Sequence, residues 1–448
     1  MGHGSEDRIE YCVKMLRRKT DAWEIFYSHQ NGLSIEAKDG KVDAFKVSSS
    51  EGVGLKVLKD KKIGFSFTSA LSKDSLNELV ENAVAGSLGV ESDEFLSLPS
   101  PQKKPAGELM LFDSVLDKVT EEDKIKKAIS LEQAARGFDP RVTKVRKASY
   151  GESCVQSRLV NSTGIDVKKI TTFITSSITA VAEDRGDSQM GWDVDMSHFA
   201  NDVDVVKVGR GAAKRAVDML GARAIETVKC PVIIENVIVG EFLEILAPSF
   251  YADNLSKGKS MLKGKKGKKI FNEKITLCDD GLLPNGWSTS EYDGEGVPRQ
   301  KTCLIDKGIC KKYLYDSYWA KREGKASTGN ASRSNFKSIS TIGISNLYME
   351  KGETDFEGLL RQMGNGLLIT NILGAHTANP ITGDFSFGAS GLWVEDNKIA
   401  YPVRGAAIAG NMLELFSKID VVGSDLRFLG SVGASSVLIS EMEISGAN

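Results

Sequence analysis

Hydrophobic and polar residues follow two different periods in the first hundred residues of the chain. Ile9, Cys12, Val13 and Leu16 recur at the spacing of one helix face, which predicts a helix over residues 5–19. The following residues alternate or are rich in β-forming side chains, with tight-turn signals at 31–32, 39–40 and 60–61. An antiparallel meander is therefore expected, and a second helical pattern over 72–86 follows it. The predicted strands are residues 23–29, 33–38, 44–50, 54–59 and 62–68.

A second unit begins after the proline- and lysine-rich segment at 99–107, which is typical of a linker. Helical patterns cover 120–136 and 206–220. Between them, long antiparallel strands are expected at 142–149, 152–161 and 166–183, with a turn at 162–164. The run from 171 to 182 is β-branched almost throughout, which favours strand over helix.

From Cys230 onward the chain is rich in glycine, which is typical of a compact, many-stranded region with close backbone contacts. Residues 232–246 read as a buried strand that runs into an apolar helix ending before Pro248. Residues 374–411 predict a loop, a strand, a hairpin through Asp396 and Asn397, a further strand and a helix.

The pattern as a whole predicts an α+β protein. Antiparallel strands flanked by helices are expected first, and a glycine-rich, many-stranded region after them. Three domains are expected: a helix, β-meander and helix domain at 1–100, an α+β domain at 108–225, and a glycine-rich, mainly β domain at 228–448.

Charge and composition narrow the classes of function. A net charge of −2 creates no field that attracts nucleic acid, so direct nucleic-acid binding is not expected. The lysine-rich segment at 257–269 lacks interleaved aromatic residues, which favours a solvated loop. No apolar run approaches the ~18 residues of a membrane span, and the polar N-terminus does not resemble a secretory signal, so we expect a cytoplasmic protein without membrane contact. The six scattered cysteines contain no CxxC and are expected to be reduced and mostly buried.

The histidine pattern argues against zinc catalysis in this chain. There are four histidines, and none stands in the HxxxH or HExxH spacing that puts two imidazoles on one helix face beside an activating glutamate. The strand-to-helix segment at 232–246 carries Glu235, Asn236, Glu241 and Glu244 but no histidine or cysteine. Carboxylates alone could hold a hard cation such as Mg²⁺, but these are not gathered into a ligand loop, so its glutamates are expected to face solvent. Ser386 and Ser390 lack a nucleophile-elbow context. We therefore predict no catalytic residue and no metal ligand.

Short polar, glycine-bearing segments are the remaining candidates for a site. YDGEGVPR at 292–299 and STGNASR at 327–333 either line a site or cap strands. The spacing of Asp293 and Glu295 fits a strand rim as well as an acid pair. His376 is either a hydrogen-bond donor for a peptide or a turn residue.

The same segments carry a family resemblance. GDFSFGASGLWVEDNKIAYPVRGAAIAGN (383–411), the tail SSVLISEMEISG (435–446), YDGEGVPR, STGNASR and the N-terminal meander together resemble the TldD/PmbA family, also called modulator of DNA gyrase. The TldD branch of that family carries HExxxH on the strand-to-helix segment and a cysteine ligand near the C-terminus. Here Glu235 and Gly240 stand at about the histidine positions, and no cysteine follows Cys310. The chain therefore resembles the PmbA (TldE) branch.

The resemblance implies a two-part architecture, with an α/β N-terminal half of antiparallel sheets flanked by helices and a mostly β C-terminal half, assembled as a dimer around an internal cavity. It also implies a subunit of a TldD-type metalloprotease system that processes or degrades unfolded peptides. The implied partner is a TldD-like, metal-bearing subunit, or a second copy of this chain. A zinc-type metal is expected only in the partner, and no cofactor in this chain. An extended peptide would be held in the cavity, with Tyr292, Glu295, Arg333, His376 and Asp384 as candidate peptide-binding residues. Two alternatives stay open: a self-sufficient peptidase that uses another chemistry, and a regulator linked to DNA gyrase.

Overall fold

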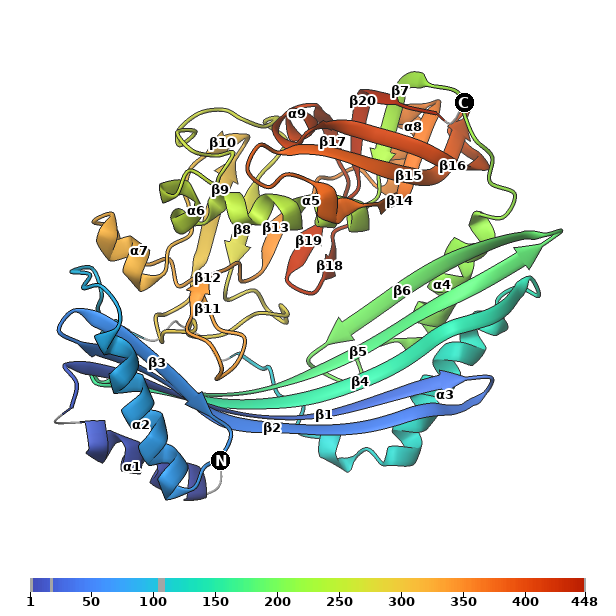
Figure 1. Cartoon of the computed structure of the whole chain (residues 1–448). Coiled ribbons are helices and arrows are strands. Elements are labelled where there is room, and N and C mark those ends of the chain that lie inside the picture. The colour runs from blue at the N-terminus through green and yellow to red at the C-terminus, as the bar shows by residue number, and fades with distance from the viewer. Residues whose placement is uncertain (1–2, 17–18, 104–108, 447–448) are drawn as a thin grey trace.

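One long, curved, antiparallel sheet forms the N-terminal half of the protein (Figure 1). The computed structural model describes residues 3–16, 19–103 and 109–446. The strand order is β3-β2-β1-β4-β5-β6, so a strand from the first predicted unit, β1, pairs with a strand from the second, β4, in a single sheet. The strands are β1 (Ala22–Lys38), β2 (Lys41–Lys59), β3 (Lys62–Thr68), β4 (Val142–Asn161), β5 (Asp166–Asp184) and β6 (Asp187–Ser197).

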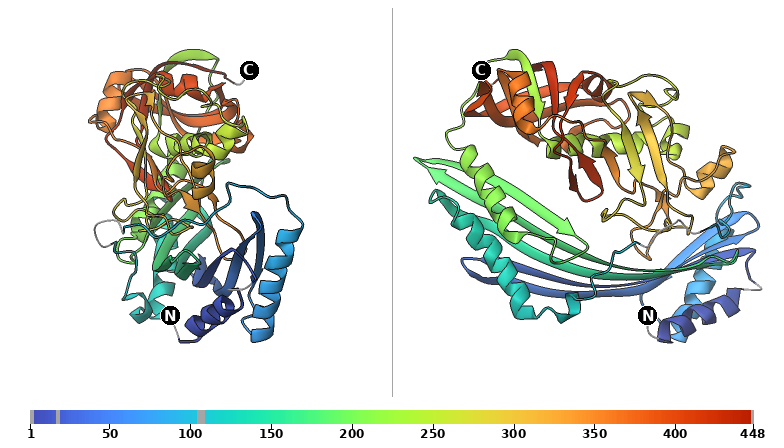
Figure 2. Two further views of the ribbon diagram at one scale, coloured as in Figure 1. Left: turned by 90° about the vertical axis from the view of Figure 1, so that its left-hand side faces the viewer. Right: turned by 180° about the vertical axis from the view of Figure 1, so that it is seen from behind.

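Two pairs of helices cover opposite ends of this sheet on the face turned away from the C-terminal half (Figure 2). Helices α1 (His3–Leu16) and α2 (Lys73–Leu88) pack on Ile25 and Leu55, while α3 (Glu121–Arg136) and α4 (Val205–Asp218) pack on Ile35 and Ile174. Because side chains alternate between the two faces of a strand, the residues between these apolar positions face the C-terminal half. The concave face of the sheet is therefore left uncovered by helices.

The predicted helices at 72–86, 120–136 and 206–220 are confirmed, as are the turns at 39–40 and 60–61, where Asp39, Asp60 and Lys61 have positive φ. The predicted turn at Asn31 and Gly32 is wrong, because β1 continues through it. A Cβ on Gly32 would lie 2.8 Å from Ser48 Oγ, so glycine here permits close approach of β2 rather than a reversal. The expected break at residues 51–53 is likewise absent from β2.

Three other features of the N-terminal half differ from the predictions. β4 runs unbroken through the expected gap at 150–151, and β6 was not predicted. The helix expected over 5–19 ends at Leu16, and residues 17–18 lie outside the described residues.

The C-terminal half contains two six-stranded sheets with helix α5 (Asn236–Leu246) between them. The first has the order β10-β9-β8-β13-β19-β18 and the second β16-β15-β14-β7-β20-β17. Strands of the first sheet are β8 (Leu277–Asp280), β9 (Lys301–Asp306), β10 (Ile309–Cys310), β13 (Leu347–Met349), β18 (Arg427–Leu429) and β19 (Val432–Ala434). Strands of the second are β7 (Val228–Ile234), β14 (Gly366–Leu373), β15 (Asp384–Glu395), β16 (Lys398–Asn411), β17 (Ile419–Val422) and β20 (Val437–Ile444). The remaining elements are β11 (Ala331–Ser332), β12 (Thr341–Ile342), α6 (Ala252–Ser256), α7 (Ser317–Arg322), α8 (Phe356–Met363), α9 (Met412–Ser417) and the 3-10 turns Leu116–Lys118, Ala247–Phe250 and Ala375–Thr377.

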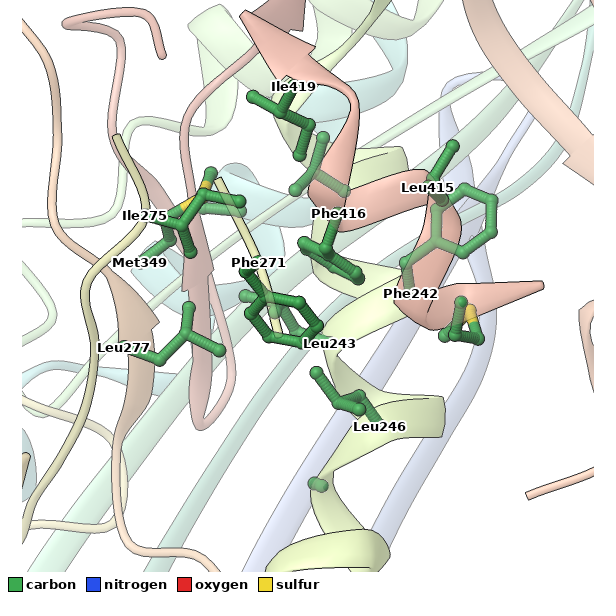
Figure 3. Close-up of a cluster of buried hydrophobic side chains, with 14 of the residues drawn as sticks. Phe242, Leu243, Leu246, Phe271, Ile275, Leu277, Met349, Leu415, Phe416 and Ile419 are labelled. Carbon is green, nitrogen blue, oxygen red and sulfur yellow. The ribbon is translucent and has the colours of Figure 1, made fainter. Parts of the chain in front are cut away.

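Helix α5 is the centre of the main hydrophobic core (Figure 3). Its side chains Phe242, Leu243 and Leu246 are buried against Phe271 and Phe416, which come from the flanking loop and α9. A helix that is apolar on nearly every side is stable only between two layers, which explains the sandwich. The predicted strand-to-helix segment and the predicted hairpin at 396–397 are both confirmed.

These elements confirm the predicted α+β class, with a mostly β C-terminal half. No helix among the described residues is long and apolar enough to cross a membrane. All six cysteines are free, and four of them are buried. The lysines of segment 257–269 are mostly exposed, but Ser260, Met261 and Leu262 are buried, so the prediction of a solvated loop fails for its centre.

Candidate functional site

A cavity of about 880 Å³ lies between the concave face of the sheet and two loops of the C-terminal half, at 287–299 and 332–336. Strands β1, β2, β4 and β5 form its floor. The volume falls within the range of sites that bind small molecules and peptide segments.

The floor of the cavity consists largely of small hydroxyl side chains. Strand register aligns them: Gly32 of β1 lies opposite Ser48 of β2 on one side and Ser153 of β4 on the other, and Gly151 lies opposite Thr175 of β5. Small residues at every second position leave the concave face hollow, whereas intervening positions toward the two ends of the sheet, such as Ile25 and Ile174, carry the apolar cores. The lining serines and threonines are Ser28, Ser34, Ser48, Ser50, Ser149, Ser153, Ser157, Thr171, Thr175, Ser288, Ser290, Ser332 and Ser334.

An aromatic cluster holds one loop above this floor. Trp287 packs on Phe173 of β5, with ring centroids 4.7 Å apart, and stacks on His198 at 5.9 Å. The buried His198 ring lies with Nδ1 2.7 Å from the Thr172 carbonyl and Nε2 3.1 Å from the Gly286 carbonyl. One imidazole therefore joins the sheet to the loop at the rim of the cavity.

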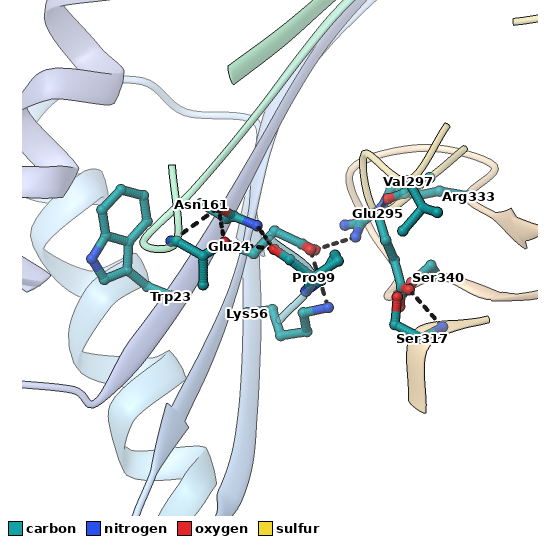
Figure 4. A network of polar contacts seen from close by, with 12 residues as sticks. Trp23, Glu24, Lys56, Pro99, Asn161, Glu295, Val297, Ser317, Arg333 and Ser340 are labelled. Atoms are coloured by element: carbon teal, nitrogen blue, oxygen red, sulfur yellow. Dashed lines mark hydrogen bonds and ion pairs between the residues drawn. The ribbon is translucent and has the colours of Figure 1, made fainter. Parts of the chain in front are cut away.

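A buried ionic cluster fixes the other loop (Figure 4). Glu24 of β1 pairs with Lys56 of β2 at 3.2 Å and with Arg333, whose guanidinium also lies 4.8 Å from the Phe26 ring centroid. Burial alone would raise the pKa of Glu24, but the two cations outweigh it and lower that pKa. Because a buried charge is tolerated only when it is paired, this cluster determines where the loop at 332–336 lies on the sheet.

Three buried carboxyl groups, those of Asp293, Glu295 and Asp316, lie beside that cluster. Asp293 accepts hydrogen bonds from the backbone N–H groups of Glu295, Val297 and Ala331, at 2.9, 2.9 and 3.0 Å. Burial and the charge of Glu295 raise the pKa of Asp293.

The third carboxyl group, Asp316, caps α7 by accepting from Trp319 N at 2.8 Å. Burial, together with the charge of Glu295, raises the pKa of Asp316 to about 6.

The structure distributes the five predicted site residues over different places. Tyr292 and Arg333 line the large cavity, although the charge of Arg333 is paired with Glu24. Glu295 lines an adjacent cavity of about 280 Å³, where it accepts from Ser317 N and Ser340 Oγ. His376 and Asp384 are exposed near the start of β15 and line neither cavity. The peptide-binding role of all five stays a prediction.

Sequence reasoning missed two of the cationic residues that line the large cavity. Lys169 and Arg299 line it, and neither was singled out. Lys169 could have been found, since it shares the period-2 face of Thr171, Phe173 and Thr175 on β5.

The start of α5, where a zinc-peptidase motif would lie, does not fit a metal. Glu235 is the N-cap residue of α5, and its two carboxylate oxygens lie 2.8 and 2.6 Å from the guanidinium nitrogens of Arg215 on α4. Gly240, one turn further on, offers no side chain and lies next to Val432. Within the described ranges, no group of three His, Cys, Asp or Glu side chains is arranged to hold a metal ion. The Arg215 guanidinium already neutralises the Glu235 carboxylate.

Comparisons with known proteins agree with this architecture. Models of the PmbA/TldA metallopeptidase domains match residues 23–87 (domain 1), 115–220 (central domain) and 227–446 (C-terminal domain), and the chain belongs to this PmbA/TldD family. It is 28% identical over 450 residues to metalloprotease PmbA of Escherichia coli O157:H7, covering 98% of this chain and 96% of that protein.

Solved structures show the same fold. A Thermotoga maritima protein named as a modulator of a DNA gyrase superimposes with a TM-score of 0.90 at 27% identity, covering 98% of this chain and all 100% of that one. TldE of Thermococcus kodakarensis has the same fold, with a TM-score of 0.90 at 24% identity over 99% of this chain and 100% of that one.

Proposed function

We propose that this chain is the non-catalytic, PmbA/TldE-like subunit of a TldD-type metalloprotease, and that it holds extended, unfolded peptide for a metal-bearing partner. The observation that carries the proposal is the start of α5. Where the family's metal-binding motif is expected, the chain has an Arg215–Glu235 ion pair and a glycine at 240. Histidine donors are absent from the segment, so the chemistry of the donor set does not suit zinc.

The large cavity supports the peptide-binding part of the proposal. Hydroxyl side chains accept or donate hydrogen bonds in any orientation, which suits main-chain amides of varied sequence. Aromatic side chains Phe26, Phe173, Trp287 and Tyr292 line the same space and offer apolar contact. A site of this composition binds the shared backbone of peptides rather than one sequence.

The partner requirement is tested by hydrolysis of an unstructured peptide. The chain alone, the TldD-like subunit of the same organism alone, and the two together are compared with and without a chelator. We expect hydrolysis by the pair, abolished by chelator, and none by the chain alone. Hydrolysis by the chain alone that resists chelation would overturn the proposal and favour a self-sufficient peptidase.

The role of the cavity is tested by two neighbouring serines of β2. Ser48 lines the cavity, while Ser49 points to the opposite face of the same strand, and both are exposed. Ser48→Trp is expected to lower hydrolysis by the pair at least about ten-fold by filling the space, and Ser49→Trp to leave it unchanged, with both variants melting at the wild-type temperature. Equal effects of the two substitutions would contradict peptide binding in this cavity.

A further inference from the structure

We infer that the large cavity binds a carboxylate group of its peptide ligand between Lys169 and Arg299. The inference rests on the proposed function, because it names the chemical group by which the peptide would be held. It arises from two cationic side chains that line one cavity, neither of which forms an ion pair with any described residue.

Arg299 is held in place by its backbone, but two nitrogens of its guanidinium have no hydrogen-bond partner among the described residues. Its backbone N–H donates to the Glu291 carbonyl at 3.0 Å, and Gly281 leaves room for its stem, since a Cβ there would lie 2.6 Å from Arg299 Cβ. Its Nε and Nη1 atoms are buried without a hydrogen-bond partner. A guanidinium in this state costs free energy unless an anion compensates it.

The two acids whose charges act on Arg299, Asp279 and Asp293, have oxygens bound by other donors. Asp279 accepts from Asn330 Nδ2 at 2.6 Å and from Ser345 N and Oγ at 2.7 and 2.6 Å. Asp293 is held by three backbone N–H groups. Both carboxyl groups act on Arg299 through space, without a hydrogen bond to it, and burial raises the pKa of each.

Lys169 provides the second positive group. It projects from β5 on the same face as Thr171 and Phe173, and its Nζ donates to the Thr289 carbonyl at 3.3 Å. Burial and the neighbouring charge of Arg299 lower the pKa of Lys169 to about 8. Two cations that repel each other in a partly buried place are stabilised together by one anion between them.

A carboxylate fits this place better than other anions if the ligand is a peptide. Guanidinium and ammonium groups make charge-assisted hydrogen bonds to carboxylates that are about twice as strong as neutral ones. The carboxylate has two sources, the C-terminus of the peptide or an Asp or Glu side chain. Both present the same group, so the experiment must distinguish them.

The test measures binding of labelled eight-residue peptides, composed of Ser, Ala and Val and carrying an uncharged fluorophore, by fluorescence anisotropy. The first peptide has a free C-terminus, the second is its C-terminal amide, and the third is the amide with one central Glu. The full-length protein is compared with Arg299→Gln and Lys169→Gln. Lys46→Gln is the control, since Lys46 lines the same cavity but is exposed and is not one of the two residues of the proposed carboxylate site.

We expect the wild type to bind the free acid at least about ten-fold more tightly than the amide. Arg299→Gln and Lys169→Gln should bring that ratio close to one, while Lys46→Gln keeps it. If the third peptide binds as tightly as the free acid, a side-chain carboxylate is a ligand of the site. If it binds as weakly as the amide, the ligand is the C-terminal carboxylate. The ratio of the two affinities is informative because a merely structural effect would weaken the binding of both peptides alike.

Two results would overturn the inference, and they differ in what else they affect. Equal binding of acid and amide to the wild type, or an unchanged ratio in Arg299→Gln and Lys169→Gln, removes the carboxylate site but leaves the peptide-binding cavity. Absence of binding by all three peptides contradicts the cavity's role in the proposed function as well.

Discussion

The C-terminal half contacts the long sheet through ion pairs at both ends, but the two contacts differ in burial. At the end covered by α1 and α2, the side chains of Glu24 and Arg333 are 0% and 2% exposed. At the end covered by α3 and α4, Arg427 of β18 pairs with Asp193 of β6 at 2.6 Å, with side chains 33% and 14% exposed. The same kind of ion pair is therefore fully buried at one end and partly exposed at the other.

The difference indicates how the cavity between the two contacts is held. A buried ion pair adds little net stability but is costly to break, which makes it a determinant of position. A partly exposed pair is screened by salt and is more readily replaced by water. The first end is therefore expected to fix the C-terminal half on the sheet, and the second to be the end that yields when the cavity changes width.

The largest expected effect comes from removing Arg333. Arg333→Met leaves Glu24 buried with Lys56 as its one remaining cation among the described residues, and we expect the free energy of unfolding to fall by about 3–5 kcal/mol. Urea titration followed by fluorescence measures it. The matched control is Lys229→Met, which breaks the exposed Lys229–Glu441 pair and should change stability by less than about 1 kcal/mol. Similar losses in both variants would show that burial does not distinguish them.

Replacement of Asp316 is expected to have an effect of intermediate size that raises, rather than lowers, the free energy of unfolding. Its folded-state pKa of about 6 lies above the usual value of 3.8, so the folded protein binds more protons than the unfolded chain and loses stability as pH rises from about 4 to 6. Asp316→Asn removes the charge, while asparagine is as good an N-cap for α7 as aspartate. The variant should be more stable than the wild type by about 2–3 kcal/mol at pH 7.5 and equally stable at pH 4.

Unfolding free energies of Asp316→Asn and wild type across pH 4–8 test this. The groups that face Asp316 are Glu295, Asp253 and Lys56, and Glu295 contributes most among them. A stability difference that stays constant with pH would exclude a penalty for ionising Asp316.

The smallest loss of stability is expected at the end of the sheet covered by α3 and α4. Arg427→Met breaks the pair with Asp193 and the hydrogen bond from Arg427 Nη2 to the Val194 carbonyl at 2.9 Å. The loss should be about 1 kcal/mol and should shrink in about 0.5 M NaCl, because the pair is accessible to salt. A loss as large as that of Arg333→Met would mean that both ends fix the C-terminal half equally.

Local sequence patterns predicted most helices and strands correctly, but they predicted breaks within strands that are continuous. Asn31 and Gly32 match a hairpin turn when only neighbouring residues are considered, yet both lie in the middle of β1, paired on either side. What overrides the local preference is the partner strand β4, more than a hundred residues away in sequence. Turns with positive φ at both central positions, such as Asp60 and Lys61, were predictable because their geometry is set within the turn itself.

The site was less predictable than the fold for a similar reason. Tyr292 and Arg333 were found because polar glycine-rich loops often line sites, and His376 was selected on the same ground although it lies elsewhere. The cavity exists because strands near residues 28–50 and 149–175 meet loops near 290 and 333, and no pattern within one segment contains that juxtaposition. Arg299 belongs to a segment that was noticed, but its lack of a partner is visible only in three dimensions.

The pairing of β1 with β4 has a consequence during synthesis on the ribosome. Glu24 of β1 lies opposite Asn161 of β4, so Glu24 leaves the ribosome 137 residues (161 − 24) before the residue that pairs with it. At about 5–20 residues per second, the edge of β1 stays open for roughly 7 to 30 s. Open strand edges invite pairing with other nascent chains. The period before β4 emerges is therefore when a chaperone would have the greatest effect on the yield of this protein.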